Sequence, residues 1–146
     1  MNRRLAREAA MCLFYEREVR KEPGNDTLIE MGDVLERGQF TDANFDYIDR
    51  ALTVYEQHLG EVDGMIAPYC HTWKIDRLSR VDISILRLAV AEMYFMEGLP
   101  YKVSINEAVE QAKKYSTEKS PAFINGILGA LVANNPPPAP DKRKTE

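Results

Sequence analysis

The fold of this chain is decided by residues 79–95, which read SRVDISILRLAVAEMYF. Ser79, followed three residues later by Asp82, resembles a capping box, and Gly98 with Pro100 forms a stop signal. Together these signals predict one helix between them. The apolar residues of the segment lie on nearly every side of such a helix, so we expect it to be packed on several sides.

Helical periodicity also dominates the flanking sequence, and no stretch alternates apolar and polar residues as a sheet requires. Gly60 is expected to break a long helix, and Ser104 to cap the helix that follows the central one. Ser120 is expected at the N-cap of the last helix, with Pro121 at its first position. The further helices are predicted over residues 3–20, near 27–37, from 41 or 42 to 69, from 104, and from 120. The sequence therefore predicts an all-α fold.

The composition fits one globular domain followed by a tail. A length of 146 residues, with 45% hydrophobic and 29% charged residues, is ordinary for a single folded domain. We assign this helical domain to residues 1–133. Residues 134–146 combine prolines with charged residues and bury too little apolar surface to fold, so we expect a disordered tail there.

Charge is distributed unevenly along the chain. Residues 22–65 contain 11 acidic and 2 basic side chains, so the remainder is net positive although the whole chain has a charge of -4. This asymmetry suits a polyanion on one surface and a basic partner on another, or it marks only a solvated face. Cys12 and Cys70 have no disulfide-framework spacing, and no apolar run approaches the roughly 20 residues that span a bilayer. We expect a cytoplasmic protein.

The inventory of reactive side chains argues against catalysis. Neither histidine, His58 or His71, has a spacing that pairs it with a nucleophile or completes a metal site, and Cys70 beside His71 lacks a second ligand pair. Glu107 and Glu110 are expected on an exposed helix face, where they serve solubility. We therefore predict no enzymatic activity, no cofactor and no bound metal.

A first candidate binding surface lies at the start of the chain. Arg3, Arg4 and Arg7 form a cationic cluster, and on a helix Arg4, Arg7 and Tyr15 share one side. Guanidinium groups bind phosphates while an aromatic face stacks an unpaired base, so this strip predicts RNA binding. The alternative is that Tyr15 belongs to the core and the arginines are simply solvated.

A second candidate surface lies at the start of the last helix. Phe123 falls at the edge of the buried stripe predicted for that helix, about 100° from its centre. The first turn after Ser120 offers backbone N–H groups to an anion, and Lys119 adds positive charge. A base stacked on Phe123 with its phosphate near the helix start fits this arrangement. A buried core role for Phe123 remains the alternative.

Three blocks of sequence closely resemble the NusB family of bacterial transcription antitermination factors. They are residues 81–90 (VDISILRLAV), 100–110 (PYKVSINEAVE) and 119–126 (KSPAFING), in this order. Residues 3–9 (RRLAREA) and 73–79 (WKIDRLS) also fit the family pattern, and the resemblance extends to about Leu131. Three such blocks in order are highly specific.

The resemblance implies two packed three-helix bundles with one additional short helix. It also implies binding to the boxA segment of ribosomal RNA transcripts, together with the ribosomal protein NusE, within an antitermination complex on RNA polymerase. The positions that match the family's RNA surface are Arg3, Arg4, Arg7, Tyr15 and Phe123. Those that match its side facing NusE are Tyr69, Asp76 and Asp82. An acidic surface for a basic ribosomal protein agrees with the charge asymmetry.

Two alternatives follow from the same resemblance. A NusB-like domain also forms the N-terminal part of some ribosomal RNA cytosine methyltransferases, but this chain ends before a cofactor-binding α/β domain begins, so we do not expect that activity. The other alternative is a homodimeric helical interaction protein whose RNA surface is masked by self-association.

Overall fold

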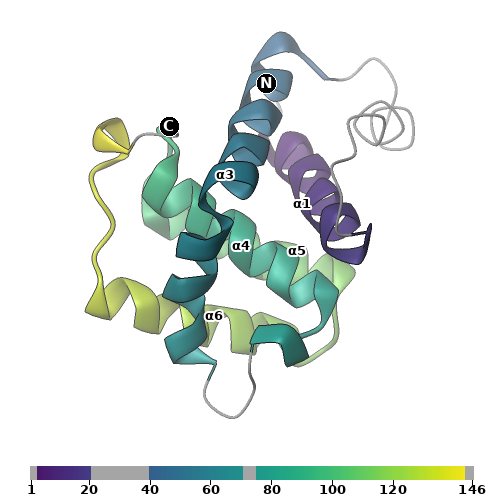
Figure 1. Cartoon of the computed structure of the whole chain (residues 1–146), viewed down its shortest axis with the longest axis vertical. Coiled ribbons are helices and arrows are strands. Elements are labelled where there is room, and N and C mark those ends of the chain that lie inside the picture. Colours follow the sequence, from purple (N-terminus) through teal and green to yellow (C-terminus); the bar gives the residue numbers. More distant parts are fainter. Residues whose placement is uncertain (1–2, 21–39, 71–74, 144–146) are drawn as a thin grey trace.

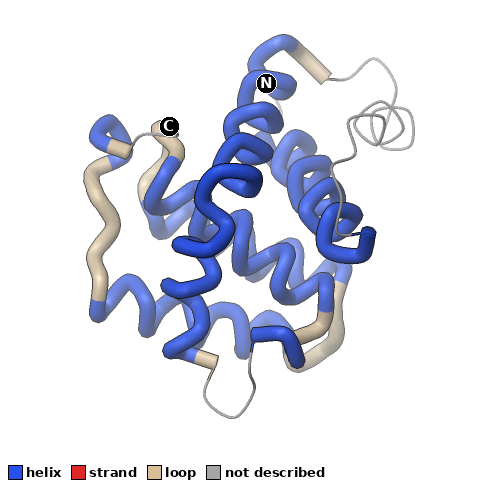
Figure 2. The backbone as a smooth tube through the Cα atoms, viewed as in Figure 1, coloured by secondary structure: helices blue, strands red, loops and turns tan. Residues whose placement is uncertain are grey.

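The computed structural model describes residues 3–20, 40–70 and 75–143, except the side chain of Asp76. Within these ranges the chain forms helices and no strand, which confirms the predicted all-α class (Figure 2). The α-helices are α1 (Arg3–Arg20), α3 (Asp42–Ile66), α4 (Arg80–Phe95), α5 (Tyr101–Tyr115) and α6 (Ser120–Asn134). Short 3-10 helices are η1 (Ala67–Tyr69), η2 (Ile75–Arg77) and η3 (Pro140–Lys142). The short helix expected near residues 27–37 lies outside the described residues.

Helix α4 is the centre of the molecule (Figure 1). It packs with α1 and α3 in one three-helix group and with α5 and α6 in another. Twelve of its sixteen residues are buried, as the apolar composition of this segment predicted. Because α4 belongs to both groups, side chains on its different faces connect all the other described α-helices.

Two predicted helix starts are confirmed. Thr41 caps α3 in a reciprocal capping box with Asn44, and the Ser79 hydroxyl accepts a hydrogen bond from the backbone N–H of Asp82 at the start of α4. These bonds satisfy N–H groups that have no partner within the helix.

Gly60, in contrast, does not break α3, which continues unbroken to Ile66. A glycine inside a helix costs only about 1 kcal/mol relative to alanine. Packing of Val62 and Ile66 in the core after this glycine outweighs that cost.

Two later helices begin at positions that differ from the prediction. Helix α5 starts at Tyr101, before Ser104, whose side chain is buried and donates to a carboxylate of α4 instead of capping. Helix α6 includes Ser120 as its first residue, and Lys119 occupies the N-cap position without a side-chain bond. Tertiary partners of the two serine hydroxyls, invisible in the local sequence, account for both differences.

Ion pairs connect helices of the first group. The guanidinium of Arg87 on α4 donates two hydrogen bonds to Asp63 on α3, at 2.8 and 2.9 Å, and one to Glu18 on α1, at 2.7 Å. One side chain of the central helix therefore holds both of its neighbours in register.

The segment after α6 is described as far as Arg143, and the last three residues of the tail expected over residues 134–146 lie outside the described residues. It extends from the end of α6 toward the end of α4 (Figure 1), and the Tyr94 hydroxyl donates to the carbonyl of Asn135 at 2.7 Å. Arg143 is only 2% exposed and donates to the carbonyls of Glu92 (3.1 Å) and Leu99 (2.9 Å). The last carbonyls of a helix lack partners within the helix. Arg143 donates a hydrogen bond to one of these carbonyls in α4, that of Glu92.

Among the described residues, no helix has both the length and the apolar composition needed to cross a lipid bilayer.

Candidate functional site

The three arginines at the start of α1 lie in different environments. Arg4 is exposed and donates through Nε and Nη2 to the two carboxylate oxygens of Glu107 on α5, at 2.9 and 2.7 Å. Arg3 is partly buried, with its guanidinium 5.2 Å from the ring centre of Tyr47. Of the predicted cluster, therefore, Arg4 is the most accessible to a ligand.

Arg7 requires a correction to the sequence prediction. It is only 4% exposed, and its guanidinium donates to both carboxylate oxygens of Glu92 at 2.8 and 2.9 Å and to Glu107 at 3.3 Å. Burial lowers the pKa of this guanidinium, but the hydrogen bonds and charge of Glu92 raise it by more. A side chain committed to two buried carboxylates holds α1 against α4 and α5 and is not available to a phosphate.

Glu92 is the centre of this buried polar network. Besides Arg7, its carboxylate accepts hydrogen bonds from the hydroxyls of Tyr47 on α3 and Ser104 on α5. Burial raises the pKa of Glu92, but the bonds from Arg7, Tyr47 and Ser104 outweigh it and leave the pKa below the ordinary value. A fully paired buried carboxylate of this kind is structural.

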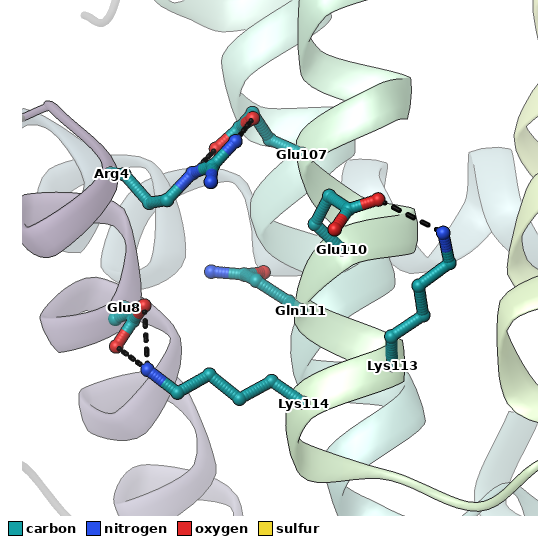
Figure 3. A pocket seen from close by; sticks show the side chains of 7 residues that line it. All are labelled: Arg4, Glu8, Glu107, Glu110, Gln111, Lys113 and Lys114. Atoms are coloured by element: carbon teal, nitrogen blue, oxygen red, sulfur yellow. Dashed lines mark hydrogen bonds and ion pairs between the residues drawn. The ribbon is translucent and has the colours of Figure 1, made fainter.

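A hollow of about 300 Å³ opens between α1 and α5 (Figure 3). Long charged side chains cross it: Arg4 reaches Glu107, and the Lys114 ammonium reaches the Glu8 carboxylate at 3.0 Å. The lining residues are Arg4, Glu8, Glu107, Glu110, Gln111, Lys113 and Lys114.

Glu107 lines this hollow in an environment that its sequence pattern did not predict. The sequence pattern put it on an exposed helix face, whereas it is 8% exposed and binds both Arg4 and Arg7. Its partners lie 103 and 100 residues away in the chain, so local spacing contains no signal for the pairing. The lysines of the same hollow, Lys113 and Lys114, were not singled out either.

Tyr15 is 39% exposed on α1, which excludes the alternative that it belongs to the core. It lies seven residues after Glu8, close to two helical turns, and therefore on the same side of α1 as the hollow. An accessible aromatic ring thus follows the charged side chains along this face.

A second hollow, of about 270 Å³, lies between the start of α4 and the start of α6. Its lining residues are Arg77, Leu78, Ser79, Asp82, Thr117, Lys119, Ser120 and Phe123. Phe123 is partly buried and packs against the core while also lining this hollow. The structure thus brings together Lys119 and Phe123, predicted to face RNA, and Asp82, predicted to face a protein.

Ser120 and the start of α6 are less available to an anion than expected. The Ser120 side chain is buried, and its hydroxyl donates to Asp82 at 3.0 Å. Pro121 has no N–H, while the N–H groups of Ser120 and Phe123 already donate to the carbonyls of Thr117 and Lys119. Phe123 and Lys119 are therefore the accessible features of this hollow.

Of the three residues predicted to face a protein partner, the structure describes the surroundings of Tyr69 and Asp82. Tyr69 is partly buried in η1, which packs against α3 and α6. Asp82 is 9% exposed, and its carboxylate accepts from Ser116 at 2.6 Å and from Ser120 at 3.0 Å, which joins α4 to the end of α5 and the start of α6. The side chain of Asp76 lies outside the described residues.

No group of three or more histidine, cysteine, aspartate or glutamate side chains is arranged to hold a metal ion within the described ranges.

Comparison with known proteins relates this geometry to a family. The NusB family model matches residues 4–133. The chain is 43% identical over 141 residues to the transcription antitermination protein NusB of Clostridium botulinum (strain Loch Maree / Type A3), covering 90% of this chain and all of the relative.

Solved structures give the same result. T. maritima NusB superposes with a TM-score of 0.81 at 31% identity, covering 94% of each chain. A chain from a crystal structure of the antitermination factors NusB and NusE in complex with dsRNA has a TM-score of 0.80 at 27% identity, covering 90% of this chain and 96% of that one.

Proposed function

Because this chain belongs to the NusB family, we propose that it is a transcription antitermination factor that binds the boxA segment of ribosomal RNA transcripts together with the ribosomal protein NusE. It acts in the cytoplasm as part of an antitermination complex on RNA polymerase and catalyses no reaction. Its role is to hold an RNA segment and a protein partner at the same time.

The proposed RNA surface consists of Arg3, Arg4, Tyr15, Lys119 and Phe123. The observation that supports it best is the hollow beside α6, where the Phe123 ring and the exposed Lys119 lie together. An aromatic ring stacks an unpaired base, and a neighbouring cation binds the phosphate. Arg7 is not part of this surface because it is buried, and Ser120 contributes by fixing the start of α6.

The proposed partner surface includes Tyr69, Asp76 and Asp82. The relative solved with NusE and dsRNA supports a protein partner for this fold. The acidic balance of residues 22–65 suits a basic partner such as a ribosomal protein. Asp82 lines the same hollow as Phe123, so RNA and protein would meet at the start of α4.

Fluorescence anisotropy with a labelled boxA-type RNA and a scrambled control, with and without NusE, tests this function. Wild type is expected to bind the boxA-type RNA selectively and more tightly with NusE present. Arg4→Ala and Phe123→Ala are expected to weaken this binding, whereas Lys142→Ala, an exposed lysine in η3, leaves it unchanged.

Equal, negligible binding of wild type to both RNAs, with NusE present, contradicts the proposal. Light scattering with and without RNA tests the homodimer alternative. A stable dimer that dissociates when RNA is added would indicate that self-association masks the RNA surface.

A further inference from the structure

The hollow between α1 and α5 presents two cations, Lys113 and Lys114, that the proposed RNA surface does not include, beside Arg4, which it does. The side chains of Arg4, Lys113 and Lys114 are 61%, 60% and 59% exposed, although each is paired with a carboxylate. Figure 3 shows Arg4 from α1 and Lys114 from α5 reaching into the same gap, while Lys113 lines its border on α5 and extends toward Glu110. The accessible layer of this groove is therefore positive.

The matching carboxylates lie mostly beneath this layer. The side chains of Glu107 and Glu8 are only 10% and 12% exposed, while that of Glu110 is 41% exposed. Formal charges in the groove cancel, but Coulomb energy falls with distance, so an anion arriving from solvent meets the cations first. The buried carboxylates Glu107 and Glu8 fix Arg4 and Lys114 in position, which reduces the entropy lost when a ligand binds.

These cations retain donors for a second anion. A guanidinium has five N–H groups and an ammonium three. Arg4 uses Nε and Nη2 on Glu107, and the single Nζ of Lys114 contacts the two oxygens of Glu8 at 3.0 and 3.1 Å. A phosphate oxygen can therefore be added to either cation without breaking its internal ion pair.

The groove also has a direction that connects the two predicted RNA-binding regions. Along α1, Arg4 precedes Glu8, and their partners on α5, Glu107 and Lys114, follow in the same order, so the two helices run parallel. Tyr15 lies farther along this side of α1. Helix α5 ends just beyond Lys114, and the chain then leads to the hollow that contains Phe123.

From this arrangement we infer that Lys113 and Lys114 bind RNA phosphates, and that the strand follows the groove from Arg4 toward Tyr15 and Phe123. The inference rests on the proposed function and deepens it by adding a contact region that reads the RNA backbone. An acidic peptide is a weaker candidate for the groove, because accessible aromatic rings continue the line of cations and suit bases.

The salt dependence of binding tests this inference. Each phosphate neutralised on single-stranded RNA contributes a slope of about -0.7 to the plot of log affinity against log salt concentration. The double variant Lys113→Ala/Lys114→Ala is therefore expected to have a slope shallower by about 1.4. When the salt concentration rises from about 50 to 200 mM, the fold-loss of affinity of this variant should be about 7 times smaller than the fold-loss of wild type.

Matched variants complete the experiment. Lys102→Ala removes an exposed lysine that lines a different hollow on the same helix, and its slope should equal that of wild type. Lys113→Arg/Lys114→Arg keeps both charges and should also retain the wild-type slope. The effect of the double alanine variant should be the same on boxA-type and scrambled RNA, because phosphate contacts contain no sequence information.

The outcomes separate this inference from the proposed function. Selective RNA binding by wild type, with the same slope in the double alanine variant, overturns the groove assignment and leaves the proposed function intact. The groove assignment is also overturned if the double alanine variant keeps the wild-type salt slope but no longer distinguishes boxA-type from scrambled RNA. The lysines would then contact bases instead of phosphates. Absence of RNA binding by wild type contradicts both.

Discussion

Arg7 on α1 and Glu92 on α4 form a two-bond ion pair, at 2.8 and 2.9 Å, in the interior of the protein. The same carboxylate accepts from Tyr47 on α3 and Ser104 on α5. One residue of the central helix thus bonds to three other helices. This pairing converts an arginine that the sequence assigned to RNA binding into part of the framework.

Removing one partner of this pair should destabilise the fold strongly. Breaking a buried ion pair leaves an uncompensated charge and costs about 3–5 kcal/mol. We expect Arg7→Ala and Glu92→Gln to lower the free energy of unfolding by about that amount in urea denaturation. Glu110→Gln, at a half-exposed pair with Lys113, should change it by less than about 1 kcal/mol. An Arg7→Ala variant of wild-type stability would contradict the structural role.

Stability should fall in acid below about pH 4.5. The bond from Arg4 lowers the pKa of Glu107, and the bonds from Arg7, Tyr47 and Ser104 lower that of Glu92, both from an ordinary 4.5. A carboxyl whose folded pKa is depressed stabilises the fold above its unfolded pKa and loses this contribution as pH falls through the folded pKa. Urea midpoints measured at decreasing pH should show the decline, and Glu107→Gln should make it less steep.

The two accessible aromatic rings should contribute to RNA affinity through stacking. Removing an aromatic ring that stacks on a base typically costs about 1–3 kcal/mol, or roughly 5- to 150-fold in affinity. We expect Tyr15→Ala and Phe123→Ala to weaken binding within this range, and Tyr15→Phe to retain most of it. Phe45, which is exposed on α3 outside both hollows, provides the control. Equal affinities for wild type and both alanine variants would exclude stacking at these sites.

The segment after α6 should contribute to stability through Arg143. Its guanidinium donates to the carbonyls of Pro138, Glu92 and Leu99, and its removal leaves polar groups without partners at a cost of about 1–3 kcal/mol. Thermal unfolding should therefore occur at lower temperature in Arg143→Ala. Lys142→Ala alters the exposed preceding residue and should leave the transition unchanged. A lower unfolding temperature in Lys142→Ala than in Arg143→Ala would contradict the burial of Arg143.

The sequence predicted those parts of the fold that depend on local signals. The caps at Thr41 and Ser79 and the all-round apolar α4 were correct because capping and periodicity act within a few residues. The start of α5 and the continuation of α3 through Gly60 were wrong, because packing between distant helices decided them.

The candidate site was harder to predict from the sequence, because contacts between distant helices decide the environment of its residues. Tyr15 and Phe123 could be chosen from their places on helical faces, and both line or adjoin an accessible surface. Whether an arginine is exposed, as Arg4 is, or buried, as Arg7 is, depends on carboxylates about 100 residues away. No local pattern distinguishes two arginines three residues apart on one helix.

The long separation between Arg7 and its partners has a consequence for synthesis on the ribosome. Glu92 is translated 85 residues after Arg7, and Glu107 100 residues after it. At about 5–20 residues per second, α1 waits roughly 4 to 17 seconds for the first of these carboxylates. During that interval its apolar side has no α4 to cover it and is open to chaperones. Helix α1 can contact α3 earlier, through the rings of Phe14 and Tyr55, but its buried ion pair forms only after α4 has been made.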